Sequence, residues 1–170
     1  NTPGLRALQD KGALDELLAA VLAERAHPNC AVPVFLKVAP DLEPADVDDI
    51  SSLALHHGLD ALIISNTTIA RPRLRSPFAH ETGGLSGAPL KQASLERLRD
   101  FRRATGGAMP LIGVGGIANA DDAWERIRAG ASLIQVYSMM VYEGPSIADN
   151  ICRGLERLMK RDGFASIAEA

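Results

Sequence analysis

The glycine-rich run Gly113-Val114-Gly115-Gly116 stands where a short apolar run gives way to a stretch of helical periodicity. Glycine lets the backbone approach an anion closely, and the N–H groups that open a following helix can point at a phosphate. The same residues also suit a tight turn with positive φ angles, so their spacing alone fits either role. The spacing is not G-x-G-x-x-G, and a dinucleotide site gains little support from it.

Lys37 is the most informative charged residue. It lies between Phe35 and Val38, in a short apolar run that we expect to form a strand buried on both faces. Burying an ammonium group without a partner is costly. The side chain could reach solvent or pair with Asp41, but we favour a cation that faces an anionic ligand at the end of the strand.

Polar residues follow two other apolar runs, as Ser65-Asn66-Thr67-Thr68 and as Tyr137-Ser138. Such residues can simply cap loops. However, α/β proteins build binding sites at the carboxyl ends of their strands. Gly83 to Gly87 closes the long segment that follows Thr68, and its backbone could approach the same ligand.

Hydrophobic periodicity predicts short strands that alternate with amphipathic helices. The predicted strands are 32–39, 59–65, 110–114 and 133–137, and the predicted helices are 13–25, 44–57, 89–105, 119–129 and 146–161. This alternation indicates a parallel sheet with right-handed crossovers, in which the polar strand ends meet at one edge. Four strands do not close a barrel of eight, so the sheet is either open and doubly wound or half of a barrel.

Composition excludes several classes of protein. A net charge of −3 gives no general attraction for nucleic acid, and we expect the basic stretch 71–75 to be solvated. Cys30 and Cys152 lie too far apart in sequence for a C-x-x-C pair, and no His and carboxylate spacing suggests a metal site. The pair His56-His57 ends a predicted helix, where a structural or solvated role is expected. No apolar stretch approaches the ~20 residues of a membrane-spanning helix.

Taken together, these segments resemble the dihydroorotate dehydrogenases, and most closely their quinone-linked, membrane-associated class. The matching stretches follow the order of the family along nearly the whole chain. They are residues 1–6 (NTPGLR), 37–41 (KVAPD), 65–68 (SNTT), 81–87 (ETGGLSG), 113–117 (GVGGI), 128–133 (RAGASL) and 137–138 (YS).

The resemblance implies an α/β fold, the C-terminal half of a (β/α)₈ TIM barrel, with residues 1–170 as a single region and FMN at the carboxyl ends of the strands. Lys37 would stabilise the charge that reduction places on the flavin ring, and Ser65 would contact FMN. The phosphate and ribityl region would be held by Gly87, Gly116, Tyr137 and Ser138. The pyrimidine and its carboxylate would be hydrogen-bonded by Asn1, Asn66 and Thr67.

The resemblance also implies the reaction, which is oxidation of dihydroorotate to orotate in de novo pyrimidine (UMP) biosynthesis. A Ser or Cys base would remove the C5 proton, hydride would pass from C6 to flavin N5, and a quinone would reoxidise the flavin. The base, the first half of the barrel and an N-terminal membrane-binding segment are all expected upstream of Asn1. We therefore expect no catalytic residue within 1–170, a soluble and inactive fragment, and a full-length protein peripheral to a membrane, on its cytoplasmic side if bacterial.

Two other functions fit the residues. One is a different FMN- or phosphate-binding barrel enzyme, which the identity of the residue before Asn1 would help to distinguish. The other is a non-catalytic α/β module that binds a phosphorylated ligand. Flavin absorbance in the full-length protein would exclude such a module, because a plain binding module shows none.

Overall fold

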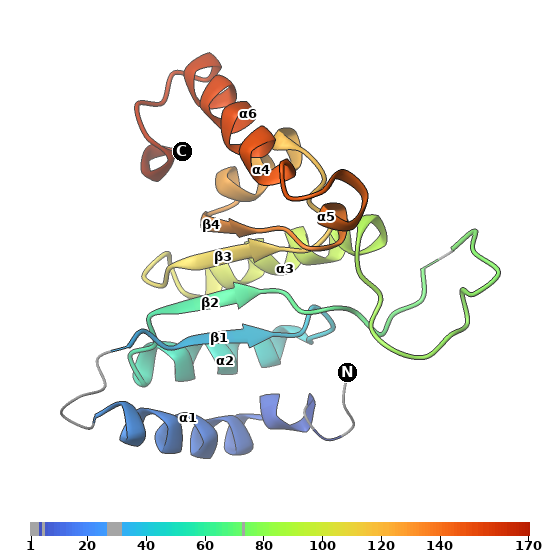
Figure 1. The fold of residues 1–170 in the computed structure, drawn as a ribbon. Helices are drawn as coiled ribbons and strands as arrows, with labels where there is room; N and C mark the ends of the chain where they lie inside the picture. The colour runs from blue at the N-terminus through green and yellow to red at the C-terminus, as the bar shows by residue number, and fades with distance from the viewer. Residues whose placement is uncertain (1–3, 5, 27–31, 73) are drawn as a thin grey trace.

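The chain folds into four parallel strands that alternate with helices. A computed structural model describes residues 4, 6–26, 32–72 and 74–170. The strands are β1 (Phe35–Val38), β2 (Ala61–Ile64), β3 (Leu111–Val114) and β4 (Ala131–Gln135), and they lie side by side in chain order (Figure 1). A doubly wound sheet reverses its strand order at a switch point, whereas consecutive strands of a barrel follow one another. The observed order is that of a barrel segment.

The helices are α1 (Lys11–Arg25), α2 (Pro44–His56), α3 (Lys91–Ala104), α4 (Ala120–Arg128), α5 (Ser138–Glu143) and α6 (Ile147–Arg161). Short 3-10 turns cover Arg6–Gln9, Ala88–Leu90 and Ile167–Glu169. Local signals explain several of these boundaries. Helix α2 begins with a capping box between Glu43 and Asp46, and Pro44 stands in its first turn. The Asn119 side chain accepts a hydrogen bond from the Asp122 N–H and so starts α4.

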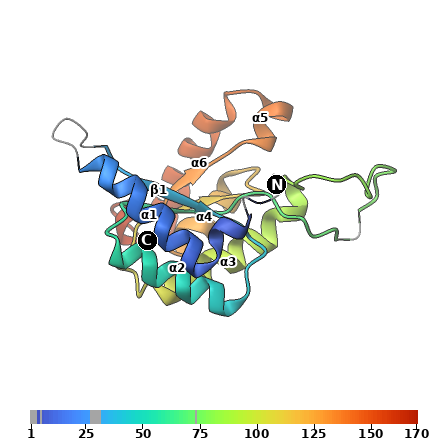
Figure 2. The same ribbon diagram turned by 90° about the horizontal axis from the view of Figure 1, so that it is seen from below.

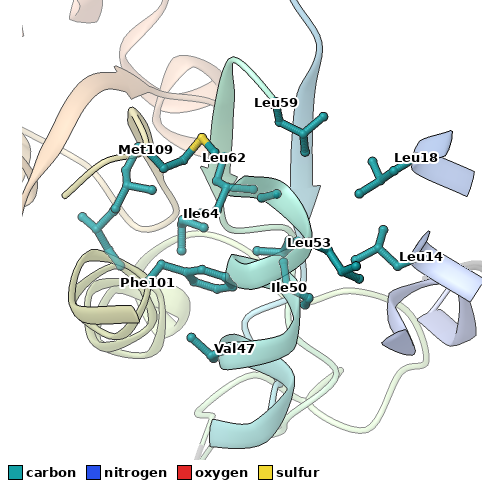
Figure 3. Packing of buried hydrophobic residues seen from close by; sticks show 14 of the residues in the cluster. Leu14, Leu18, Val47, Ile50, Leu53, Leu59, Leu62, Ile64, Phe101 and Met109 are labelled. Carbon is teal, nitrogen blue, oxygen red and sulfur yellow. The ribbon is translucent and has the colours of Figure 1, made fainter. Parts of the chain in front are cut away.

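Helices α4 and α6 lie beyond β4, and α1, α2 and α3 cover one face of the sheet (Figures 1 and 2). Alternate side chains of the strands point towards them, and the main core lies in this layer (Figure 3). It contains Leu62 and Ile64 from β2, packed with Leu14 of α1, Ile50 of α2 and Phe101 of α3. A second cluster joins α4 and α6 beyond β4 and is formed by Ile117, Ala123, Ile147 and Ile151.

On the other face of the sheet, side chains of the two edge strands remain accessible within this chain. Phe35 on β1 is 44% exposed and Leu133 on β4 is 59% exposed. Lys37 shares this face with Phe35, because residues two apart on a strand point the same way. The expectation of a Lys37 strand buried on both faces is therefore wrong. The physical reason is that β1 lies at one edge of the sheet and its second face is uncovered.

The last strand and the segment that follows it differ most from the sequence-based expectation. The predicted strand 133–137 is displaced, since β4 begins at Ala131 and ends at Gln135. Tyr137 is instead the residue before α5, a six-residue helix that the sequence did not predict. Gly144, with a φ of +72°, ends that helix. Six residues complete less than two turns, so α5 shows no measurable helical periodicity.

We expect Leu98→Ala to lower the free energy of unfolding of the full-length protein by about 3 kcal/mol, because Leu98 is fully buried in the main core. The matched control is Leu55→Ala on α2, where the side chain is 41% exposed and the loss should stay below about 1 kcal/mol. Urea unfolding monitored by circular dichroism measures both. Equal losses would contradict the proposed position of the core.

Candidate functional site

A cavity of about 670 Å³ lies at the carboxyl ends of the strands. In Figure 1 all four strand arrows point towards this side, where the loop 66–87 and α5 also lie. The sequence-predicted residues Lys37, Ser65, Asn66, Thr67, Gly87, Gly116, Tyr137 and Ser138 all line it. The structure thus brings together candidates from every strand end, while Asn1 lies outside the described residues.

The glycine-rich loop after β3 forms one wall of the cavity. Gly115 and Gly116 have φ angles of +114° and +69°, which side chains rarely adopt. A Cβ atom at Gly116 would lie 2.4 Å from the Cα of Lys91, at the start of α3. Within the described ranges, the N–H groups of Gly116 and Ile117 donate to no protein acceptor. The loop is therefore a tight turn that also leaves backbone donors for an anion.

A second wall joins two segments that are far apart in sequence. The Ser138 hydroxyl donates to the Ser86 hydroxyl over 3.0 Å. Gly87, with a φ of +74°, lies beside it, and a Cβ atom there would be 3.7 Å from the Cβ of Ser138. The end of the long loop and the start of α5 thus meet at the cavity.

The charge of the cavity comes from Lys37. Among the described residues that line it, Lys37 is the only charged side chain. The pairing with Asp41 considered from the sequence is not observed. Asp41 instead accepts from the Thr68 hydroxyl and, over 3.0 Å, from the Ile69 N–H. A cavity with a cation and no carboxylate favours an anionic ligand.

Asn66 presents a hydrogen-bond donor at the end of β2. Its backbone N–H donates to the Val38 carbonyl over 2.8 Å, which fixes the residue beside β1. Its side-chain oxygen accepts from the Thr67 N–H over 2.9 Å. The amide nitrogen donates to no protein acceptor within the described ranges, so it can donate to a ligand. Ser65 is buried, and its hydroxyl donates to the Asn66 carbonyl over 3.1 Å.

Arg126 is a buried residue near the site that the sequence did not single out. One guanidinium nitrogen, Nη2, donates to the Lys91 carbonyl over 2.6 Å, and to the Ser94 hydroxyl and the Gly115 carbonyl over 3.0 Å each. Burial lowers the pKa of this guanidinium below its ordinary value, while the nearby Glu125 and Asp122 oppose that shift. Its position between Ala123 and Ile127 on an apolar helix face was the available signal.

The remaining sequence candidates have structural roles. His57 lies 2.5 Å from the Asp15 carboxylate and links the end of α2 to α1. Arg71 is exposed but not simply solvated, because it donates to the carbonyls of Glu81 and Gly83 and braces the long loop. Across the described ranges, no three His, Cys, Asp or Glu residues are grouped as they would be around a metal ion. None of the helices in those ranges combines the length and apolarity needed to cross a membrane.

Parallel strands in chain order, helices on one face and an anion cavity at the strand ends define a segment of a (β/α)₈ barrel. Residues 1–159 match the family model described as dihydroorotate dehydrogenase. The chain belongs to the dihydroorotate dehydrogenase family, as the sequence resemblance predicted.

Relatives and solved structures agree with this assignment. Proteins named dihydroorotate dehydrogenase (quinone) from Novosphingobium aromaticivorans and Erythrobacter litoralis are 66% and 68% identical over the whole chain. The chain spans about half the length of these relatives, 48% and 49%. A structure from Eimeria tenella, in complex with ferulenol, matches the whole chain and 50% of its own length, with a TM-score of 0.93 and 38% identity. The predicted half-barrel fold is thereby confirmed.

We expect Gly116→Ala to destabilise the full-length protein by clearly more than Gly106→Ala. Gly106 has a similar positive φ of +57°, but a Cβ atom there meets nothing within 4 Å, so that variant reports backbone strain alone, about 1 kcal/mol. At Gly116 the added atom collides with the backbone of Lys91. Thermal unfolding compares the two variants. Equal shifts would show that the close approach to α3 is absent.

Proposed function

We propose that the whole protein oxidises dihydroorotate to orotate in pyrimidine biosynthesis, with FMN bound in this cavity and a quinone as electron acceptor. The observation that carries the proposal is the joint presence of Lys37, Asn66 and the glycine-rich loop around one cavity at the ends of the strands. The names and high identity of the relatives support the reaction and the acceptor.

The cavity has the size and the donors that FMN requires. Its volume of about 670 Å³ is typical of a small-molecule site. The N–H groups of Gly116 and Ile117 form a donor set for a phosphate, next to Ser138 and the backbone of Gly87. When bound, FMN supplies the hydride acceptor for the oxidation.

The side chains at the ends of β1 and β2 suit the other parts of the reaction. The Lys37 ammonium would stabilise negative charge on the reduced flavin ring, since no carboxylate is among the described residues that line the cavity. The Asn66 amide nitrogen and Thr67 would orient the pyrimidine and its carboxylate. Because the chain spans about half the length of its relatives, the activity belongs to the whole protein. We expect residues 1–170 by themselves to leave dihydroorotate unoxidised.

We further propose that the whole protein works at a membrane surface, on the cytoplasmic side in a bacterium. The support is chemical, because long-chain quinones dissolve in the bilayer and a quinone-linked enzyme must meet them there. Contact with the membrane would be made outside residues 1–170. Fractionation of cells that express the full-length protein, with and without a high-salt wash, tests this localisation.

The direct test of the activity uses the purified full-length protein. We expect visible flavin absorbance that dihydroorotate bleaches under anaerobic conditions, and that a short-chain ubiquinone restores faster than NAD⁺ or fumarate. A preference for NAD⁺ or fumarate would show that the electron acceptor is not a quinone. Protein without flavin that also fails to bind added FMN would favour a non-catalytic module.

Asn66→Asp should raise the KM for dihydroorotate by about tenfold or more with little loss of flavin content. The variant keeps the acceptor for the Thr67 N–H but replaces the donor by a negative charge that faces an anionic substrate. Asn150→Asp, which makes the same change at an exposed position of α6, is the matched control. Steady-state kinetics measure the effect, and an unchanged KM would show that Asn66 does not contact the substrate.

A further inference from the structure

We propose that Arg126 is a positioning residue for the phosphate group of the flavin: it fixes the glycine-rich loop and places a positive charge directly behind it. This inference rests on the proposed function, since it requires a phosphate-bearing ligand in the cavity. Arg126 does not line the cavity itself and acts through Gly115, which does.

The orientation of one peptide group carries the first part of the proposal. Nη2 of Arg126 donates to the Gly115 carbonyl over 3.0 Å from the side away from the cavity. The Gly115–Gly116 peptide bond is trans, because the described cis peptide is Ile64–Ser65. In a planar trans peptide the C=O and N–H bonds point in opposite directions. Holding the Gly115 oxygen therefore turns the Gly116 N–H away from Arg126 and towards the cavity.

The same nitrogen of Arg126 ties the loop to α3. It donates to the Lys91 carbonyl over 2.6 Å and to the Ser94 hydroxyl over 3.0 Å. That hydroxyl in turn lies 3.0 Å from the Gly115 carbonyl oxygen. Gly113 leaves room for this arrangement, since a Cβ atom there would be 3.2 Å from the Cβ of Arg126. Three segments of the chain thus converge on one guanidinium.

The charge of Arg126 carries the second part. The side chain is fully buried, and its Nε and Nη1 atoms have no hydrogen-bond partner among the described residues. Of the two carboxylates whose charge acts on it, Asp122 is paired with the Lys91 ammonium and also accepts from the Ala118 N–H over 2.9 Å, and Glu125 lies 3.7 Å from the Arg99 guanidinium. A buried cation without a direct counter-ion is costly. A phosphate on the other side of the Gly115–Gly116 peptide would compensate it.

The test separates a phosphate-directed role from a merely structural one by comparing FMN with riboflavin, which lacks the phosphate. In the full-length protein freed of flavin, Arg126→Gln keeps an amide donor but removes the charge. We expect it to weaken FMN binding by about tenfold or more, with little change in riboflavin binding. Arg126→Lys retains the charge and should keep most of the preference for FMN.

The matched control is Arg128→Met, which removes the same charge from the same helix. Arg128 is exposed and contacts the C-terminal segment, where it lies over the Phe164 ring and donates to the Ala170 carbonyl. It should leave both affinities unchanged. Fluorescence quenching of each flavin measures the affinities, and inorganic phosphate added as a competitor reports on the phosphate subsite alone.

Equal losses of FMN and riboflavin affinity in Arg126→Gln would overturn the proposal, as would unchanged FMN affinity. If Arg126→Gln fails to fold, Arg126→Lys decides, because loss of the FMN preference despite the retained charge also overturns it. Failure of the proposed function looks different. In that case the unsubstituted protein itself would bind neither flavin, or would bind both equally well.

Discussion

A Cβ atom at Gly116 would lie 2.4 Å from the Cα of Lys91. The loop after β3 can therefore contact the start of α3 only if position 116 has no side chain. This close approach sets the geometry of the cavity. It brings the backbone donors of the loop next to Gly87, and Gly87 lies against Ser138 at the start of α5. A side chain at position 116 would separate the two walls, and neither wall alone could enclose an anion.

The charges around the cavity follow a simple division. Lys37 lines the cavity at one end of the sheet, and Arg126 lies buried behind the glycine-rich loop. Neither cation forms an ion pair with a carboxylate in the described part of the chain: Asp122 pairs with the Lys91 ammonium, and Asp41 accepts from the Thr68 hydroxyl and the Ile69 N–H. The described residues that line the cavity therefore carry a positive charge, although the whole chain has a net charge of −3. An anionic ligand is attracted by this local arrangement, whatever the overall charge.

The sequence predicted the alternation of strands and helices well, because buried parallel strands and amphipathic helices have distinct periods. It also predicted which residues meet, since parallel strands bring their carboxyl ends to one edge. It could not decide between a doubly wound sheet and a half-barrel, because strand order leaves no trace in periodicity. It missed α5 for lack of length. It missed Arg126 although the residue falls on the apolar face of α4, because a long arginine side chain on such a face can still carry its charge to solvent. The sequence also could not predict that Lys37 is exposed, because this depends on β1 being at the edge of the sheet.

Three separate groups of Lys91 make contacts near the site. Its Cα packs against Gly116, its carbonyl accepts from Arg126 and its ammonium pairs with Asp122. Two of these are backbone groups, which any residue type supplies. Sequence drift at position 91 thus costs one ion pair, whereas adding or removing a residue between 86 and 91 would shift every backbone contact at once. Over evolution, length changes in this region should accumulate in the tip of the exposed loop around residues 74–80, where insertions leave the contacts with α3 in place.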